Sequence, residues 1–249
     1  MDDMDRLRET VRNLNIPVLG VASADMWDSD PVVSSNVPVE RRPKSIMPEC
    51  RSAIVIGVPI QSTVIDTAPS IYYRELYKVT NAILDDSAQR IVMALEMMGH
   101  RAVFIPRDGY HGMAGLLKDP TSFFSHKHSA YLAGLGTFGV NNLILTKKYG
   151  PRIRFTTILT DAVLPYGKPM ESQICIRCMK CRDVCPANAI GDDIYPITKI
   201  DKVKCTKNSE MLNRKGISPC GRCAAVCPVG EHMTPPTDEA IENIRRYTL

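Results

Sequence analysis

Eight of the nine cysteines lie in one stretch towards the end of the chain, between Cys175 and Cys227. The first four follow the spacing C-x2-C-x2-C-x3-C, and a proline comes directly after the last of them, Cys185. Thiolates at this spacing bind 4Fe–4S clusters: three surround one cluster, and the fourth ligates the other cluster of a pair. These residues therefore indicate one-electron chemistry carried by iron and sulfide.

A second run of cysteines supplies the remaining ligands. It ends in Cys-Pro like the first run, but Ile217 stands where its leading cysteine is expected. Cys205 lies upstream, beyond an insertion at 206–219, and we expect it to take that place. Exchange of the fourth ligands then gives two complete sets. Cluster 1 is expected on Cys175, Cys178, Cys181 and Cys227, and cluster 2 on Cys185, Cys205, Cys220 and Cys223.

Other uses of these cysteines fit the sequence less well. A disulfide scaffold belongs to oxidising compartments. The start of the chain is charged and has no apolar core, unlike a secretory signal, so we expect a cytoplasmic protein. Zinc sites do not require the C-x3-C-P endings. Cys205 is the weakest ligand, since the insertion could leave it free and reduce cluster 2 to three irons. Cys50, outside this field, is expected to be a plain buried thiol.

The overall composition is that of a globular protein of one large or two modest domains, with 249 residues, 44% hydrophobic and 23% charged. Its net charge of +4 is too small and too dispersed to indicate a nucleic-acid partner by itself. The longest apolar runs fall far short of the roughly 20 residues that a membrane span requires, so no membrane association is expected.

The segment ahead of the cysteines is longer than an electron carrier needs, so we expect it to bind a cofactor or perform chemistry. Apolar patterns predict strands at 17–22, 52–59, 101–105 and 150–161, and helices at 6–14 and 70–99. Strands separated by such helices favour an α/β layer with the sheet between helices. We expect an α/β domain that binds cofactor and substrate at 1–168, and a ferredoxin-like domain with both clusters at 169–249. Arg152 and Arg154, on the last strand, are expected in solvent or paired with carboxylates.

A glycine-rich segment at 133–142 has the spacing G-x-G-x-x-G of a dinucleotide-binding loop. Its context differs from such a loop, because 125–132 ahead of it looks helical and no acidic residue follows in a βαβ frame. Glycines at this density either allow a turn to pack a helix on the sheet or let the backbone approach a different cofactor. Both interpretations remain open from the residues alone.

The glycine segment, the sequence Ile-Leu-Thr-Asp at 158–161 and the cysteine runs together resemble the epoxyqueuosine reductases and, more distantly, the corrinoid-dependent reductive dehalogenases. The resemblance extends from Arg42 to Pro228. It implies a nitroreductase-like α/β domain that holds cobalamin with its lower base displaced, beside a two-cluster domain that supplies single electrons to cobalt. It also implies that the corrin is bordered by Ala133, Gly134, Gly136, Gly139 and Asn141. Epoxyqueuosine reductases continue into helical repeats that help to hold tRNA, whereas about 20 residues follow Cys227 here, so a tRNA substrate is not expected.

The family resemblance also points to a proton donor ahead of the glycine segment. In those enzymes an aspartate in this region resembles a donor, and Asp119 lies near that position but about one residue off it. His126, His128 and Tyr131 follow in the same segment and could donate protons or line a pocket. The alternative is that both histidines lie at the surface before a helix. Our candidate catalytic residues are Asp119, His128 and Tyr131, whereas His100 and His232 are expected to be structural or solvent-facing.

The sequence thus predicts an oxygen-sensitive reductase that passes single electrons through two clusters to a bound corrinoid and acts on a small substrate. A low-potential donor such as ferredoxin or flavodoxin is the expected source of electrons. Two alternatives remain: a protein that delivers electrons or a cofactor to a partner enzyme without catalysis of its own, and a flavin-dependent reductase on the same fold.

Overall fold

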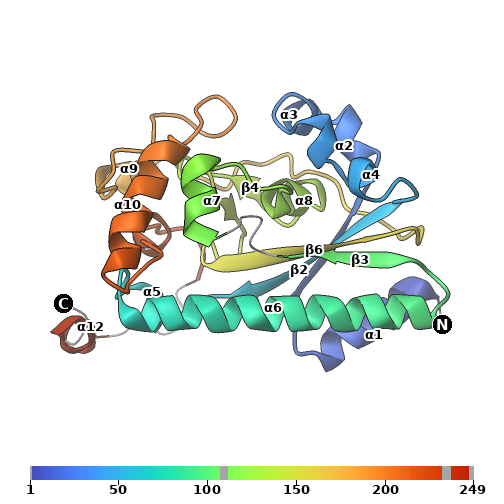
Figure 1. The fold of residues 1–249 in the computed structure, drawn as a ribbon, viewed down its shortest axis with the longest axis horizontal. Helices are drawn as coiled ribbons and strands as arrows, with labels where there is room; N and C mark the ends of the chain where they lie inside the picture. Colours follow the sequence, from blue (N-terminus) through green and yellow to red (C-terminus); the bar gives the residue numbers. More distant parts are fainter. Residues whose placement is uncertain (1, 107–111, 232–236, 247–249) are drawn as a thin grey trace.

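The computed structural model describes residues 2–106, 112–231 and 237–246. It has the predicted mixture of helices and sheet. At its centre lies a four-stranded antiparallel sheet in the order β1-β2-β6-β3. The strands are β1 (Val18–Ser23), β2 (Ser52–Pro59), β3 (Ala102–Ile105) and β6 (Ile153–Thr160). Figure 1 shows helices on both faces of this sheet, as the alternation of strands and helices predicts.

Strand β2 is the centre of the sheet because its sequence is apolar on both faces. Ile54 pairs with Val21 of β1 on one side and with Ile158 of β6 on the other. The first six residues of β2 are all buried. A continuous apolar run of this kind is typical of a strand that is covered on both sides.

The longest helix, α6 (Ile71–Met97), covers one face of the sheet together with α1 (Asp3–Asn13). It begins where the Ser70 hydroxyl accepts a hydrogen bond from the amide of Tyr73, at 3.0 Å. It ends before Gly99, whose φ of 89° is a helix-terminating conformation. Its buried residues recur at helical spacing and pack on the sheet: Leu84, Ala88, Ile91, Val92 and Leu95.

The opposite face of the sheet is covered by α8 (His126–Leu132) and by an aromatic and aliphatic core around Trp27. Short helices lie beside this core: α2 (Met26–Ser29), α3 (Pro31–Ser34), the 3-10 turn η1 (Val39–Arg41) and α4 (Pro43–Ile46). Two others lie elsewhere: α5 (Ser62–Ile65) packs with α6, and α7 (Gly112–Lys118) lies beside α10 (Figure 1).

The cysteine region packs at one end of the sheet and has little regular structure. A two-stranded hairpin, β4 (Thr137–Phe138) and β5 (Ile144–Leu145), leads towards it. Its helices are α9 (Lys180–Asp183), α10 (Lys202–Arg214) and α11 (Arg222–Ala225), and α12 (Asp238–Arg246) follows. Among the described residues, no helix combines the length and the apolar character that crossing a membrane demands.

Candidate iron–sulfur centres

The four cysteines expected to bind cluster 1 surround one small cavity. The residues that line it include Cys175, Cys178, Cys181 and Cys227, with Val140 and Asn141 from the glycine-rich segment. The pKa of the Cys181 thiol is raised to about 11, mainly by burial and in part by three nearby thiols: Cys227, Cys175 and Cys178. These thiols come from two distant parts of the chain and converge on one space.

The remaining cysteines form a second group. The pKa of the Cys223 thiol is raised to about 12, mainly by burial and in part by neighbouring thiols: Cys220, Cys205, Cys181 and Cys185. Burial also raises the pKa of Cys205, with Cys185 and Cys220 as its thiol neighbours. The helix α10 thus brings Cys205 to the second group despite the insertion, and Cys181 lies between the two groups.

The grouping matches the exchanged ligand sets that the spacing predicts, and iron binding itself stays a prediction. Within the described ranges, no three His, Cys, Asp or Glu side chains come close enough together to bind one metal ion. A zinc ion draws four ligands into one tight tetrahedron, whereas a 4Fe–4S cluster has a separate iron for each thiolate. The grouped but separated thiols therefore fit a cluster better than a zinc ion.

Left-handed residues shape the turns that carry these ligands. Met179 has a φ of 62° directly before α9, and Gly221 has a φ of 70° directly before α11. A side chain on Gly221 would collide with Tyr73 and Ala68, so glycine is required there both for its conformation and for the close approach. The second cysteine run is thereby pressed against the start of α6.

Arg152 links the sheet to the cysteine region, and the sequence did not predict this role. It is only 2% exposed, and its guanidinium donates to the carbonyl oxygen of Cys227 at 2.7 Å and to that of Val229 at 2.8 Å. Arg152 is thus not in solvent, which was one of the two expectations, and the charge of Asp66 acts on it, which agrees with the other. Its neighbour Arg154 donates to Asn81 at 2.6 Å and lies over the ring of Tyr77.

The glycine-rich segment supports the cysteine region from the other side. The Asn141 amide donates to the carbonyl oxygen of Cys223 at 3.3 Å, and the Gln173 side-chain oxygen accepts from the amide of Cys175 at 3.1 Å. The ammonium of Lys127 donates to the carbonyl oxygen of Asn142 at 2.9 Å. Burial lowers the pKa of Lys127 to about 8.

The three glycines of this segment approach the chain itself. A side chain on Gly134 would collide with the carbonyl oxygen of Lys168, and one on Gly136 with that of Leu145. At Gly139 the obstacle is the Leu145 side chain. Ala133, which is buried, contacts Gly167. These contacts agree with the interpretation in which the glycines allow tight packing, and the expectation that the segment borders a corrin stays a prediction.

The candidate proton donors Asp119 and Tyr131 have different settings. Asp119 directly follows α7, which packs beside α10. It is exposed, and its carboxylate lies 3.4 Å from the guanidinium of Arg41. Hydrogen bonds from Thr121 and the charge of Arg41 lower the pKa of Asp119, so it holds no proton near neutral pH. The ring of Tyr131 packs against that of Phe138, and burial raises its pKa. The role of either residue as a proton donor stays a prediction.

The two histidines differ in burial. His128 is 7% exposed, with Nδ1 2.7 Å from the Ser125 hydroxyl and Nε2 2.9 Å from the Tyr195 hydroxyl. Burial lowers its pKa to about 3. His126 is partly buried and lies 3.0 Å from the Thr157 hydroxyl, and burial lowers its pKa to about 4. His128 therefore does not lie at the surface as the alternative interpretation held, and both rings are neutral hydrogen-bonded groups.

His100 and Cys50 lie outside the two cysteine groups. His100 lies 2.9 Å from the carboxylate of Asp3 and 3.6 Å from that of Asp161, which is a structural role. His232 lies outside the described residues. Cys50 is fully buried, as expected, and burial raises its pKa to about 11.

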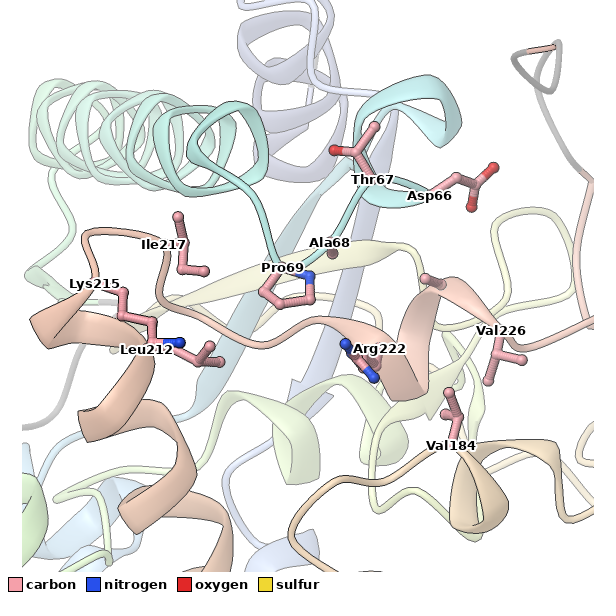
Figure 2. A pocket seen from close by; sticks show the side chains of 11 residues that line it. Asp66, Thr67, Ala68, Pro69, Val184, Leu212, Lys215, Ile217, Arg222 and Val226 are labelled. Atoms are coloured by element: carbon pink, nitrogen blue, oxygen red, sulfur yellow. The ribbon is translucent and has the colours of Figure 1, made fainter. Parts of the chain in front are cut away.

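A cleft of ≈ 650 Å³ lies beside the cysteine groups (Figure 2). Its walls come from the loop between α5 and α6, from the end of α10 and from the turns that carry cysteines. Val184 precedes Cys185, and Val226 precedes Cys227, so the cleft borders both groups. The lining is mainly apolar, with a few polar groups: Asp66, Thr67, Lys215 and Arg222. Sequence patterns did not reveal this cleft, because its walls meet only in the folded chain.

Comparison with known proteins defines the class to which this site belongs. Residues 174–231 match the 4Fe-4S dicluster domain. The tetrachloroethene reductive dehalogenase of Dehalobacter restrictus is 28% identical over 193 residues, which cover 71% of this chain and 32% of that enzyme. The epoxyqueuosine reductase of Synechocystis is 31% identical over 133 residues, or 48% of this chain and 44% of that enzyme. The matched regions span less than half the length of these two relatives.

Solved structures show the same fold. The epoxyqueuosine reductase of Streptococcus thermophilus superposes with a TM-score of 0.64 at 16% identity, over 96% of this chain and 69% of that one. A reductive dehalogenase described in terms of B12-dependent dehalogenation has a TM-score of 0.67 at 19% identity, over 97% of this chain and 33% of that one. Residues 174–231 thus match a dicluster iron–sulfur domain. Over a longer part of its length the chain is similar in sequence to reductive dehalogenases and epoxyqueuosine reductases.

Proposed function

We propose that this chain is an iron–sulfur reductase that moves single electrons through two 4Fe–4S clusters to a corrinoid, for the reduction of a small substrate. The observation that carries the proposal is the convergence of eight cysteines into two groups of four beside a common cleft. Both classes of named relatives are reductases, which supports an oxidoreductase.

The cleft suits an organic cofactor in size and chemistry. Its ≈ 650 Å³ falls within the range of cofactor and ligand sites, which are mostly apolar with a few convergent polar groups. Thr67, Lys215 and Arg222 would hold the polar side groups of a corrinoid, and Leu212 and Ile217 would cover its apolar surface. A bound corrinoid supplies a cobalt centre that accepts one electron at a time.

The chain's own residues position the predicted ligands and exclude water from them. Arg152 fixes the turn at Cys227 from the sheet, and Asn141 fixes the turn at Cys223. Val140 packs among the cysteine turns with Ile190, so the space between the two groups is apolar. Burial and hydrogen bonds of this kind are the features by which a protein sets cluster potentials.

Anaerobic purification followed by iron, sulfide, cobalt and flavin analysis tests the proposal. We expect both clusters and uptake of added hydroxocobalamin, seen in its visible spectrum. Leu212→Trp, which fills the cleft, is expected to abolish this uptake and to leave the iron content unchanged. Arg8→Glu, at the distant exposed face of α1, is the control and is expected to behave like the unmodified protein.

The outcomes separate the two parts of the proposal. If the iron-loaded protein takes up no cobalamin, the corrinoid part of the proposal is wrong. If it binds flavin instead, a flavin-dependent reductase is supported. Clusters that reduce a substrate only after a partner enzyme is added support an electron-delivery protein. Unchanged uptake by Leu212→Trp places the corrinoid outside this cleft.

A further inference from the structure

The helix α10 has two different faces, and they point in opposite directions. Cys205 joins the second thiol group from the inner face. Four exposed residues form a stripe along the outer side of the same helix, which we name the α10 stripe: Val203, Lys207, Met211 and Arg214. They are separated by four, four and three residues. At 100° per residue these four share one side, and Cys205 lies roughly opposite to them.

Two apolar side chains of the α10 stripe are exposed in the part of the chain that the structure describes. Val203 is 54% exposed and Met211 is 58% exposed. They alternate along the helix with Lys207 and Arg214, which are also exposed. An apolar centre with basic groups beside it is typical of a protein-docking surface.

Positive charge is concentrated around this helix. Residues 199–222 contain seven Lys or Arg and two Asp or Glu, an excess of five, whereas the whole chain has a net charge of only +4. The rest of the chain therefore has about as many acidic as basic groups. Such a local field attracts an acidic partner and raises its rate of association.

We propose that the α10 stripe is the docking surface for an acidic one-electron donor protein, which reduces cluster 2 through α10. This inference rests on the proposed iron–sulfur function. A donor docked on the stripe is separated from cluster 2 by no more than the thickness of one helix, about 10 Å. One electron leaves the donor and enters cluster 2, and no bond is formed or broken.

The test is the rate at which the anaerobic, iron-loaded protein is reduced by a reduced acidic 2Fe–2S ferredoxin, followed by stopped-flow absorbance. At low ionic strength, Lys207→Glu is expected to slow this reduction about tenfold or more and to weaken its dependence on salt. Met211→Ser is expected to slow it with the salt dependence unchanged. Arg8→Glu makes the same change of charge on α1, far from α10 (Figure 1), and is expected to have no effect.

Dithionite, a small reductant that needs no docking surface, separates the possible failures. The proposal requires all variants to be reduced by dithionite at the rate of the unmodified protein. The docking proposal is overturned if Lys207→Glu slows reduction by dithionite as much as reduction by ferredoxin. It is also overturned if Lys207→Glu does not slow reduction by ferredoxin. Binding of an RNA hairpin that Lys207→Glu abolishes, with ferredoxin reduction unchanged, assigns the stripe to nucleic acid and also overturns it. Absence of any reducible cluster instead contradicts the underlying function.

Discussion

The sheet and the cysteine region are held together by different means. In the sheet, β2 is buried over six consecutive residues and has an apolar core on each face. Between 174 and 231, by contrast, α9 and α11 have four residues each, and α10 buries only Thr206. The sheet thus has a large apolar core on each face, whereas we expect the cysteine region to depend on cluster ligand bonds and on hydrogen bonds from the sheet.

The largest expected effect is therefore that of iron removal. Because metal binding supplies folding free energy where the apolar core is small, chelation of iron is expected to unfold 174–231 and to leave the sheet intact. Hydrogen exchange read by mass spectrometry measures this: amides of α10 lose protection, and those of β2 and β6 retain it. Equal loss of protection in both regions would show that they form one cooperative unit.

Shortening one buried side chain in the sheet core also tests the difference between the sheet and the cysteine region. Leu84→Ala, on the buried face of α6, is expected to lower the free energy of unfolding by about 2–5 kcal/mol, because it leaves a cavity in a packed core. Denaturant titration gives this value. The iron content of the folded protein is expected to stay at its original level. Loss of iron at low denaturant would contradict the separation of the two regions.

Arg152 is the exception that joins the regions, and Arg152→Met tests its role. The substitution leaves the buried carbonyl oxygens of Cys227 and Val229 without their donor, at a cost of about 1–3 kcal/mol each. We expect faster loss of iron to a chelator than in Leu84→Ala. Arg154→Met, a matched change on the same strand, is the control, because Arg154 contacts Asn81 rather than the cysteine turns.

A smaller effect is expected from pH through His128. Burial lowers its pKa to about 3 in the folded chain, whereas the unfolded chain binds a proton near pH 6.5. Stability from the neutral ring is present above pH 6.5 and is lost as pH falls towards 3. Between pH 6.5 and 5.5 the loss amounts to about 1 kcal/mol. Thermal unfolding of His128→Gln is expected to show a shallower pH dependence, and an unchanged slope would contradict this assignment.

Much of the fold could be predicted from patterns within short stretches. The apolar run at 52–59 is strand β2, the helical spacing at 70–99 is α6, and 125–132 is helical, as α8 shows. The cysteine spacing also predicted which thiols converge, because ligand exchange follows from the geometry of a cluster pair.

Other features depend on contacts between distant residues, which local patterns do not contain. The glycines at 134 and 136 serve contacts with Lys168 and Leu145, far along the chain or across a hairpin. In the sequence, Arg152 looks like a surface residue at the start of a strand. It donates to backbone carbonyl oxygens, and such acceptors have no sequence signature. The cleft at Asp66 and Arg222 is formed by three separate segments.

The central claim is that two cross-ligated 4Fe–4S clusters are bound by the cysteine region. Its most direct test is the metal and sulfide content of anaerobically isolated protein, together with that of Cys205→Ser. The account predicts about eight irons and eight sulfides per chain, with loss of iron from one cluster in the variant. Colourless protein that contains zinc and no sulfide would contradict it.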